Sequence, residues 1–166
     1  MRELTKIERA ALVSIAATDD PDRLRNYIAN ARRQSSAAVE RAAFLRLCEV
    51  QPEANPGTVE HDVWQSIHAL EEMLRDERGK TVRLTRSRQK IGRDGEAKTV
   101  SDLTMKADPS AGFTDLIERG HPELTFEAVV LRHPKTFDRA VQSAARDRLS
   151  KANVNVDELL NPVEGN

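Results

Sequence analysis

The sequence predicts a mainly α-helical protein: a compact multi-helix domain of about eight helices, with one short strand or hairpin near residues 81–84. Apolar residues recur at spacings of three and four in several segments, which is the pattern of helices that each bury one face. Aromatic residues make up only 4% of the chain, whereas alanine, leucine and arginine, which favour helices, are abundant. The balance of 39% hydrophobic and 32% charged residues is typical of a soluble globular protein.

Three helices are expected in the first 50 residues, which we interpret as an N-terminal helical subdomain (residues 1–50). Each has a helix-start signal, a short polar side chain placed where it can accept a hydrogen bond from the first helical turn. These signals are Thr5 with Glu8, Asp20 before Pro21, and Ser35 or Ser36. Because the second and third helices are joined by a very short connection, they should pair as an antiparallel hairpin.

Residues 51–57 are predicted to form a linker, since two prolines and a glycine occur within seven residues. The main helical domain should follow over residues 58–153, and residues 154–166 should form a C-terminal tail with only a short turn. Beyond the basic segment described below, helices are expected at residues 111–119, 122–133 and 137–151. The second of these is unusually apolar, so it is the best candidate for a central buried helix.

The main domain is predicted to begin with a long acidic helix that carries one apolar stripe. The stripe is formed by Val59, Val63, Ile67, Leu70 and Leu74. Thr58 is the expected N-terminal cap of this helix, and Gly79 is its expected end. Trp64 lies beside the stripe, so it should widen the buried face or contact a neighbouring element.

Beyond this helix, apolar residues alternate with polar ones, which predicts a short strand over residues 81–84. Thr85 should then cap a brief helix over residues 86–91 that ends at Gly92. A hairpin that turns at Asp94-Gly95 is the alternative, because this dipeptide favours tight two-residue turns.

A second short helix is expected to start at Val100. Thr99 and Asp102 have the spacing of a capping box, in which two side chains satisfy the first backbone N–H groups of a helix. Together the two short helices predict a helix-turn-helix-like unit over residues 86–105.

Charge is distributed unevenly along the chain, although the formal net charge is only −1. Residues 50–77 carry a net charge of −6, and residues 78–98 carry +6. Residues 1–49 and 99–166 carry +2 and −3. An acidic block next to a basic one indicates either a charge match within the protein or its dimer, or a basic surface kept for an anionic partner.

The basic segment contains five cationic residues within eleven positions and no acidic residue among them. Four of the five are arginines, whose planar guanidinium groups suit phosphate oxygens and guanine edges. With the adjoining glutamine, the candidate nucleic-acid-binding residues are Arg83, Arg86, Arg88, Gln89, Lys90 and Arg93. On a helix, Arg86, Lys90 and Arg93 share one face.

The preferred hypothesis is a small non-enzymatic DNA-binding or DNA-associated accessory or regulatory protein, acting as a homodimer, with DNA favoured over RNA. The alternative is a protein-interaction module, an adaptor or inhibitor, in which the helical hairpin over residues 6–50 binds a partner. The basic segment would then pair with an acidic protein surface. Carboxylates of the same chain or of a second copy are further candidates for this pairing, namely Glu71, Glu72, Asp76 and Glu77.

No motif of nucleophilic or phosphate-binding catalysis is present, and an enzyme is not favoured, although a nuclease with a spatially assembled metal site stays open. His61 and His68 are seven residues apart, too far to share one ion on a single helix, so no metal and no cofactor are expected. Cys48 lies among apolar residues as a small core residue would. The sequence has no apolar run long enough to span a membrane and no signal peptide, which predicts a cytoplasmic protein without a membrane partner.

Overall fold

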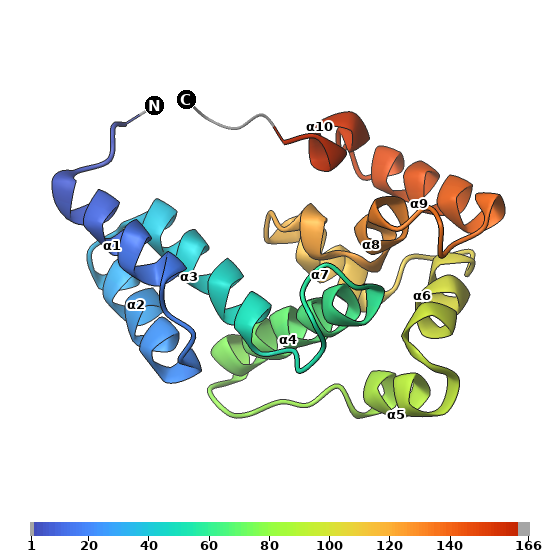
Figure 1. Cartoon of the computed structure of the whole chain (residues 1–166), viewed down its shortest axis with the longest axis horizontal. Coiled ribbons are helices and arrows are strands. Elements are labelled where there is room, and N and C mark those ends of the chain that lie inside the picture. Colours follow the sequence, from blue (N-terminus) through green and yellow to red (C-terminus); the bar gives the residue numbers. More distant parts are fainter. Residues whose placement is uncertain (1, 163–166) are drawn as a thin grey trace. The chain divides into compact units, whose positions relative to one another are not determined.

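The computed structural model describes residues 2–162, and every regular element in that range is helical (Figure 1). This confirms the predicted mainly α-helical class. The chain divides into two compact units, residues 1–53 and residues 54–166. Each unit has its own core, so each is described by itself.

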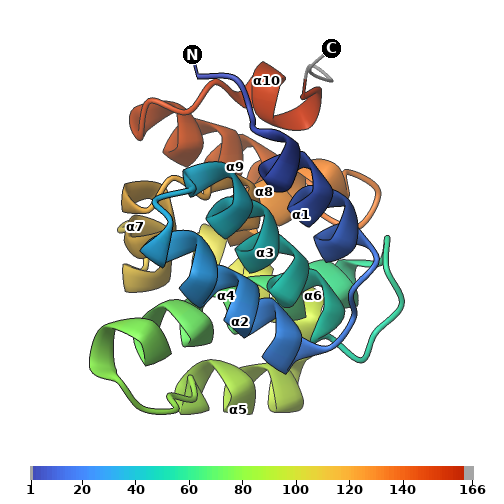
Figure 2. The ribbon, with the colours of Figure 1, turned by 90° about the vertical axis from the view of Figure 1, so that its left-hand side faces the viewer.

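The N-terminal unit consists of three helices, and alanine and branched aliphatic side chains form the core between them. They are α1 (Lys6–Ala16), α2 (Pro21–Arg33) and α3 (Ala37–Val50). As predicted, α2 and α3 pair as a hairpin, and α1 packs on α3 (Figure 2). The core contains Ile15, Leu24, Ala31, Val39, Ala43 and Leu47. Cys48 is fully buried, as expected.

The start of α1 is tied to the start of α3 through one carboxylate. The predicted capping box is present, because Thr5 Oγ1 accepts from the Glu8 backbone and the Glu8 side chain accepts from the Thr5 backbone. Glu8 also accepts hydrogen bonds from Arg2 and from Ser36 Oγ, both at 2.6 Å. The hydrogen bonds from Arg2, Ser36 and the Thr5 backbone lower the pKa of Glu8 from 4.5 to about 2.

The C-terminal unit is built around the long helix α4 and the short apolar helix α8. Its helices are α4 (Val59–Arg78), α5 (Thr85–Asp94), α6 (Glu96–Thr104), α7 (Ala111–Glu118), α8 (Phe126–Arg132), α9 (Arg139–Lys151) and α10 (Val156–Leu160), with a 3-10 turn, η1 (Pro122–Leu124), before α8. Helix α8 packs against α4, α6 and α9. Ala128, Val129 and Val130 are fully buried, which confirms the prediction of a central buried helix in this region.

The predicted ends of α4 are also confirmed. Thr58 Oγ1 accepts a hydrogen bond from the backbone N–H of His61 at 3.1 Å. At the other end, Gly79 takes the left-handed conformation, with φ of 69°, and its N–H donates to the carbonyl of Arg75. Val63 and Ile67 of the predicted stripe lie in the larger core of this unit.

The strand predicted near residues 81–84 is wrong: within residues 2–162 the structure contains no strand, and residues 81–84 have no regular structure. The Leu84 N–H donates to the Glu71 side chain at 3.0 Å, so this backbone group is satisfied by α4 rather than by a second strand. The alternative hairpin at Asp94-Gly95 is also wrong, because the residues on both sides of this dipeptide are helical rather than extended. Gly95 joins two helices, with φ of 87° and ψ of 165°.

The limits of the two short helices differ from the prediction. Helix α5 begins at Thr85 and runs through Gly92, and Leu84 occupies the cap position without a side-chain hydrogen bond. Helix α6 begins at Glu96. The predicted capping box at Thr99 is therefore wrong, since Thr99 lies inside the helix and is fully buried.

Three later elements also differ from the expected ones. The helix expected over residues 122–133 is divided into η1 and α8, because the Thr125 side chain accepts from the N–H of Ala128 and starts a new helix. Helix α9 starts at Arg139, where Asp138 provides the cap. A short helix, α10, forms where only a turn is expected. Across residues 2–162, no helix has both the length and the apolar character required to cross a membrane.

Candidate nucleic-acid interface

Helix α5 carries most of the candidate residues, and an ion pair with α4 fixes its start. Arg88 donates from Nε to Glu71 Oε1 at 2.6 Å and from Nη2 to Glu71 Oε2 at 2.7 Å. Both side chains are largely buried, with 24% of Arg88 and 11% of Glu71 exposed. A bidentate pair of this kind is directional as well as charged, so it sets the orientation of α5 on α4.

Glu71 remains ionised in this setting. Burial opposes its ionisation, but the hydrogen bonds from Arg88 and from the Leu84 N–H outweigh burial and hold the pKa of Glu71 below its ordinary value. The same pair raises the pKa of Arg88 through the hydrogen bond to Glu71. The sequence left open the alternative that the basic segment pairs with Glu71. The structure contains this pair within one chain, between Arg88 and Glu71.

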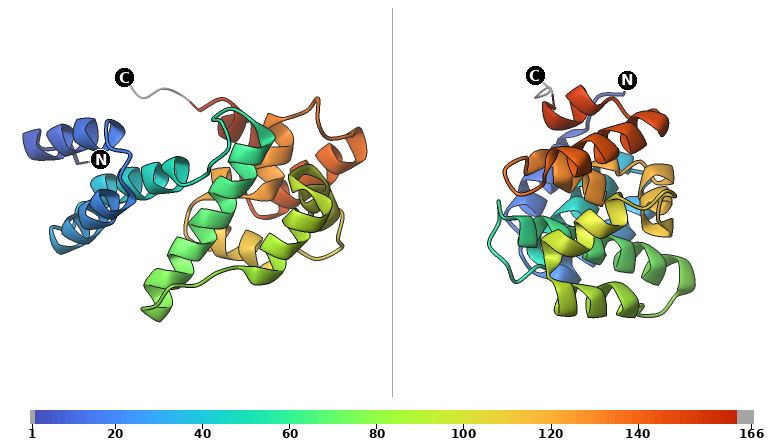
Figure 3. Two further views of the ribbon diagram at one scale, coloured as in Figure 1. Left: turned by 60° about the horizontal axis from the view of Figure 1, so that its bottom comes forward. Right: turned by 90° about the vertical axis from the view of Figure 1, so that its right-hand side faces the viewer.

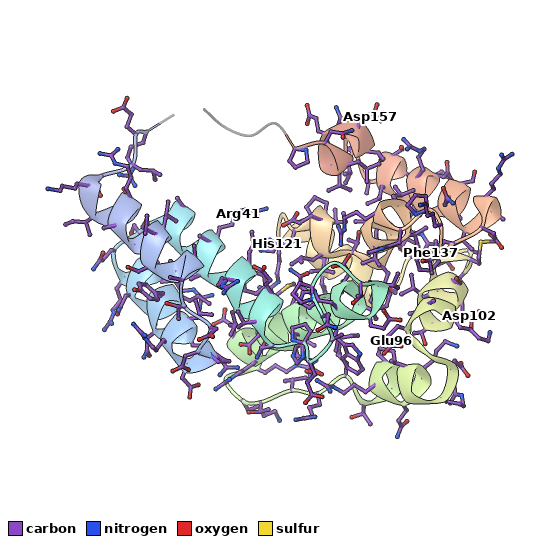
Figure 4. The ribbon with its side chains drawn as sticks, in the orientation of Figure 1. Arg41, Glu96, Asp102, His121, Phe137 and Asp157 are labelled. Atoms are coloured by element: carbon purple, nitrogen blue, oxygen red, sulfur yellow. The ribbon has the colours of Figure 1, made fainter. Side chains whose placement is uncertain are left out.

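Trp64 links this ion pair to α6. The Arg88 guanidinium carbon lies 5.2 Å from the centroid of the Trp64 ring, within the range of a cation–π interaction. Trp64 Nε1 donates to Glu96 Oε1 at 3.1 Å, and Glu96 is the first residue of α6 (Figure 4). Trp64 is half-buried against the larger core, which confirms the expectation that it extends the buried face of α4.

A second group of charges joins α5 to α6. Lys90 Nζ donates to Asp94 Oδ2 at 2.9 Å and to Asp102 Oδ2 at 2.8 Å. Lys98 also pairs with Asp102, which Figure 4 labels on α6. The hydrogen bonds to Asp102 and Asp94 raise the pKa of Lys90.

The remaining candidates are Arg86, Gln89 and Arg93 on α5 and Arg83 just before it, and we define these four residues as the exposed face of α5. All four side chains are exposed. Arg86, Gln89 and Arg93 are separated by three and four positions, so they share one side of the helix. Arg93 contacts Asp94 at 3.3 Å. Within residues 2–162, neither Arg83 nor Arg86 forms an ion pair or a side-chain hydrogen bond.

The structure thus separates the six candidate residues by role. Arg88 and Lys90 are engaged with carboxylates of the same chain, and they hold α5 against α4 and α6. The other four face outward. Sequence spacing placed Lys90 with Arg86 and Arg93, but its side chain pairs with Asp94 of α5 and Asp102 of α6 instead.

The segment forms two consecutive packed helices, α5 and α6 (Figure 3). Only Gly95 lies between them, whereas the turn of a helix-turn-helix motif has three or four residues. In that motif the second helix enters the groove. Here the exposed arginines Arg86 and Arg93 are on the first helix, so α5 would be the helix that contacts nucleic acid.

Two further ionic groups in this unit join residues that are far apart in the sequence. His133 Nε2 is hydrogen-bonded to Asp62 Oδ2 at 2.6 Å, although the two residues are 71 positions apart. Arg148 pairs with the buried Glu127 at 3.0 Å. Burial raises the pKa of Glu127 despite this partner. The only hint in the sequence is an acid inside the apolar run of α8.

No group of three or more metal-ligating side chains occurs in the part of the chain that the structure describes. Comparison with protein-family models, with curated proteins and with solved structures finds no match to this chain.

Proposed function

We propose that the protein is a cytoplasmic DNA-binding or DNA-associated accessory protein whose contact surface is the exposed face of α5. One observation carries this proposal. Residues 78–93 contain seven cations and no acid, and the exposed Arg83 and Arg86 have no carboxylate partner within residues 2–162. Arginine is suited to this role because its fixed fork of N–H donors matches phosphate oxygens.

The dimensions of the face fit a short stretch of one DNA strand. Arg86 and Arg93 are seven residues apart, which corresponds to about 10 Å along a helix axis. Phosphates of one strand repeat every 3.4 Å along the duplex axis, so the face spans about three of them. Such contacts position a protein without reading sequence, and Gln89 is the side chain placed to contact a base edge. A homodimer would double the number of contacts.

The test is a titration of the full chain with random-sequence duplex DNA at several salt concentrations. With three phosphate contacts, log affinity should fall against log salt with a slope of about −2.7, so raising salt from 50 to 200 mM should weaken binding about 40-fold. Duplex RNA and single strands should bind less tightly than duplex DNA. Absence of binding at 50 mM salt, or binding that does not respond to salt, would contradict the proposal.

A second candidate function is the protein-interaction module, and one observation favours it. Ile7 and Val13 on α1 are 77% and 73% exposed, which is unusual for large apolar side chains. Helical geometry places them about 120° apart, with the small residue Ala10 between them, so they lie on the same half of the α1 surface. If this module is the function, the chain should bind its protein partner even at 500 mM salt, and Ile7→Ser and Val13→Ser should abolish this binding. Duplex DNA should not bind to the chain.

A further inference from the structure

The C-terminal unit contains a pocket of about 310 Å³ that lies outside the α5 surface. Its walls come from the end of α6 and the segment after it, from α7 and from α9. The volume is at the lower end of the range found for small-molecule sites in proteins.

One part of the pocket wall is apolar. It includes Met105, Pro109, Phe113, Ala144 and Ala152. Met105 is 53% exposed, which makes it one of three large apolar side chains that are strongly exposed in the described part of the chain. An apolar ligand group that covers Met105 would remove this surface from water, which is favourable.

The other part of the wall is cationic. Lys106, Arg148 and Lys151 line it, against a single acid, Asp147. Lys151 pairs with Asp147 at 2.9 Å. The formal charge of the lining residues is therefore +2, and the carboxylate of Glu127, which pairs with Arg148 behind the wall, reduces the local charge to +1. This excess of positive charge favours an anionic ligand.

Arg148 is the group that gives this wall a fixed geometry, because its side chain is 90% buried and held by three partners. Nη1 donates to Glu127 Oε1 at 3.0 Å and to the carbonyl of Leu103 at 3.2 Å. Nη2 donates to the carbonyl of Lys106. These bonds join α9 to α8 and to the end of α6, so the guanidinium cannot reorient freely.

The same bonds leave part of the Arg148 donor set unused. A guanidinium has five N–H donors, and the three hydrogen bonds use two on Nη1 and one on Nη2. The Nε–H and the second Nη2–H make no hydrogen bond with residues 2–162. A largely buried cation with unused donors, in the wall of a pocket, is suited to a carboxylate, which accepts charge-assisted hydrogen bonds from a guanidinium.

We propose that this pocket binds a small organic acid, with its carboxylate at Arg148 and Lys106 and a short apolar body against Phe113 and Met105. The two walls together define the ligand class: the charge alone would admit any small anion, whereas the apolar wall adds a requirement for hydrocarbon. The inference is independent of DNA binding, since no residue of the pocket belongs to the exposed face of α5.

The probe for this site is 4-phenylbutanoate, which has one carboxylate and an apolar body of suitable size. Two matched compounds separate the two walls: 4-phenylbutanamide has the same body without charge, and acetate has the charge without the body. The chain has three methionines, and of these Met73 is buried in α4 while Met105 lines the pocket. The NMR signals of their methyl groups therefore report binding at the pocket and at a buried control position that does not line it.

We expect 4-phenylbutanoate to shift the Met105 methyl signal with a dissociation constant of about 2 mM, the affinity typical of a ligand with about twelve heavy atoms. The Met73 signal should not move. The amide and acetate should each bind at least 10-fold more weakly. The proposal is overturned if Met105 does not respond, if Met73 responds equally, or if the amide binds as tightly as the acid.

Two substitutions on α9 provide a second test that does not depend on Arg148, whose loss would disturb the fold. Ala144→Leu places a larger side chain in the pocket and should abolish the Met105 response. Ser143→Leu is the matched control, because residue 143 is exposed and does not line the pocket. Lys106→Gln should weaken binding about 3- to 10-fold. Equal responses from the parent, Ala144→Leu and Ser143→Leu would overturn the assignment.

Discussion

Arg88 lies between the carboxylate of Glu71 and the ring of Trp64, and this position makes it a stabilising residue. Replacing it with alanine would leave Glu71 largely buried with only the Leu84 N–H as a partner. We expect Arg88→Ala to lower the free energy of unfolding by about 2 kcal/mol, the typical cost of losing a partly buried charged hydrogen bond. Urea unfolding at pH 7 measures this change.

The control for this prediction is Arg86→Ala on the same helix. Arg86 is exposed and forms no ion pair within residues 2–162, so its loss should change the free energy of unfolding by less than about 0.5 kcal/mol. Equal losses at the two positions would show that Arg88 has no special role in holding α5.

Glu8 should make the stability of the N-terminal unit depend on pH. Its pKa is lowered to about 2 in the folded protein, so the folded state binds a proton less readily than the unfolded state. The stabilisation is therefore complete above the ordinary pKa of 4.5 and is lost as the pH falls from 4.5 towards 2. Thermal unfolding of the parent and of Glu8→Gln, followed from pH 7 to pH 2, measures it.

The parent should be more stable than Glu8→Gln at pH 7, and the difference should close between pH 4.5 and pH 2. Glu3→Gln is a suitable control, since Glu3 is an exposed acid close in the sequence. A difference between parent and Glu8→Gln that stays constant down to pH 2 would mean that the Glu8 hydrogen bonds do not stabilise the folded state.

At the scale of single elements, α5 shows which structural features the sequence could predict. The helix and the common side of Arg86 and Arg93 follow from local spacing, and the ends of α4 follow from Thr58 and Gly79. The irregular structure of the segment before α5 does not follow from local spacing. The backbone N–H of Leu84 donates to Glu71, which is thirteen positions away in the sequence. The pairing of Lys90 with Asp102 is similarly non-local. Local patterns therefore predicted the helices, whereas the roles of individual cations required the packing.

The junction between α5 and α6 depends on Gly95. Its φ of 87° and ψ of 165° lie in a region that only glycine adopts readily. We expect Gly95→Ala to lower the free energy of unfolding by about 1 to 3 kcal/mol through backbone strain, because no atom lies within 4 Å of the added methyl group. Urea unfolding is again the measurement.

Gly92 provides the matched control, because it lies inside α5 and an added methyl group would also meet no atom within 4 Å. Alanine favours helix over glycine, so Gly92→Ala should stabilise the protein by about 0.5 to 1 kcal/mol. Opposite signs for the two substitutions are the expected result. A destabilising Gly92→Ala would indicate that α5 is not helical at this position.

At the scale of the whole molecule, the two units have separate cores that share no residue. Residues 54–166 should therefore fold without the N-terminal unit. We expect this fragment to retain a helical circular dichroism spectrum, a cooperative thermal transition and the DNA affinity of the full chain within about threefold. Loss of the cooperative transition would show that the C-terminal unit depends on residues 1–53.

The central claim is that the exposed face of α5 binds DNA through its arginines, and a salt titration of two matched variants tests it. One variant combines Arg83→Ala, Arg86→Ala and Arg93→Ala. The control combines Lys135→Ala, Arg139→Ala and Arg146→Ala, which removes three exposed cations elsewhere in the same unit. Both variants change the net charge equally, so a difference between them reports the position of the charges.

For the α5 variant, the slope of log affinity against log salt should shrink by about 0.9 per lost phosphate contact, up to about 2.7 in total. The slope of the control variant should differ from that of the parent by less than about 0.9. The melting temperatures of both variants should lie within a few degrees of that of the parent. Equal slopes for the two variants, or an unchanged slope after loss of Arg83, Arg86 and Arg93, would contradict the claim.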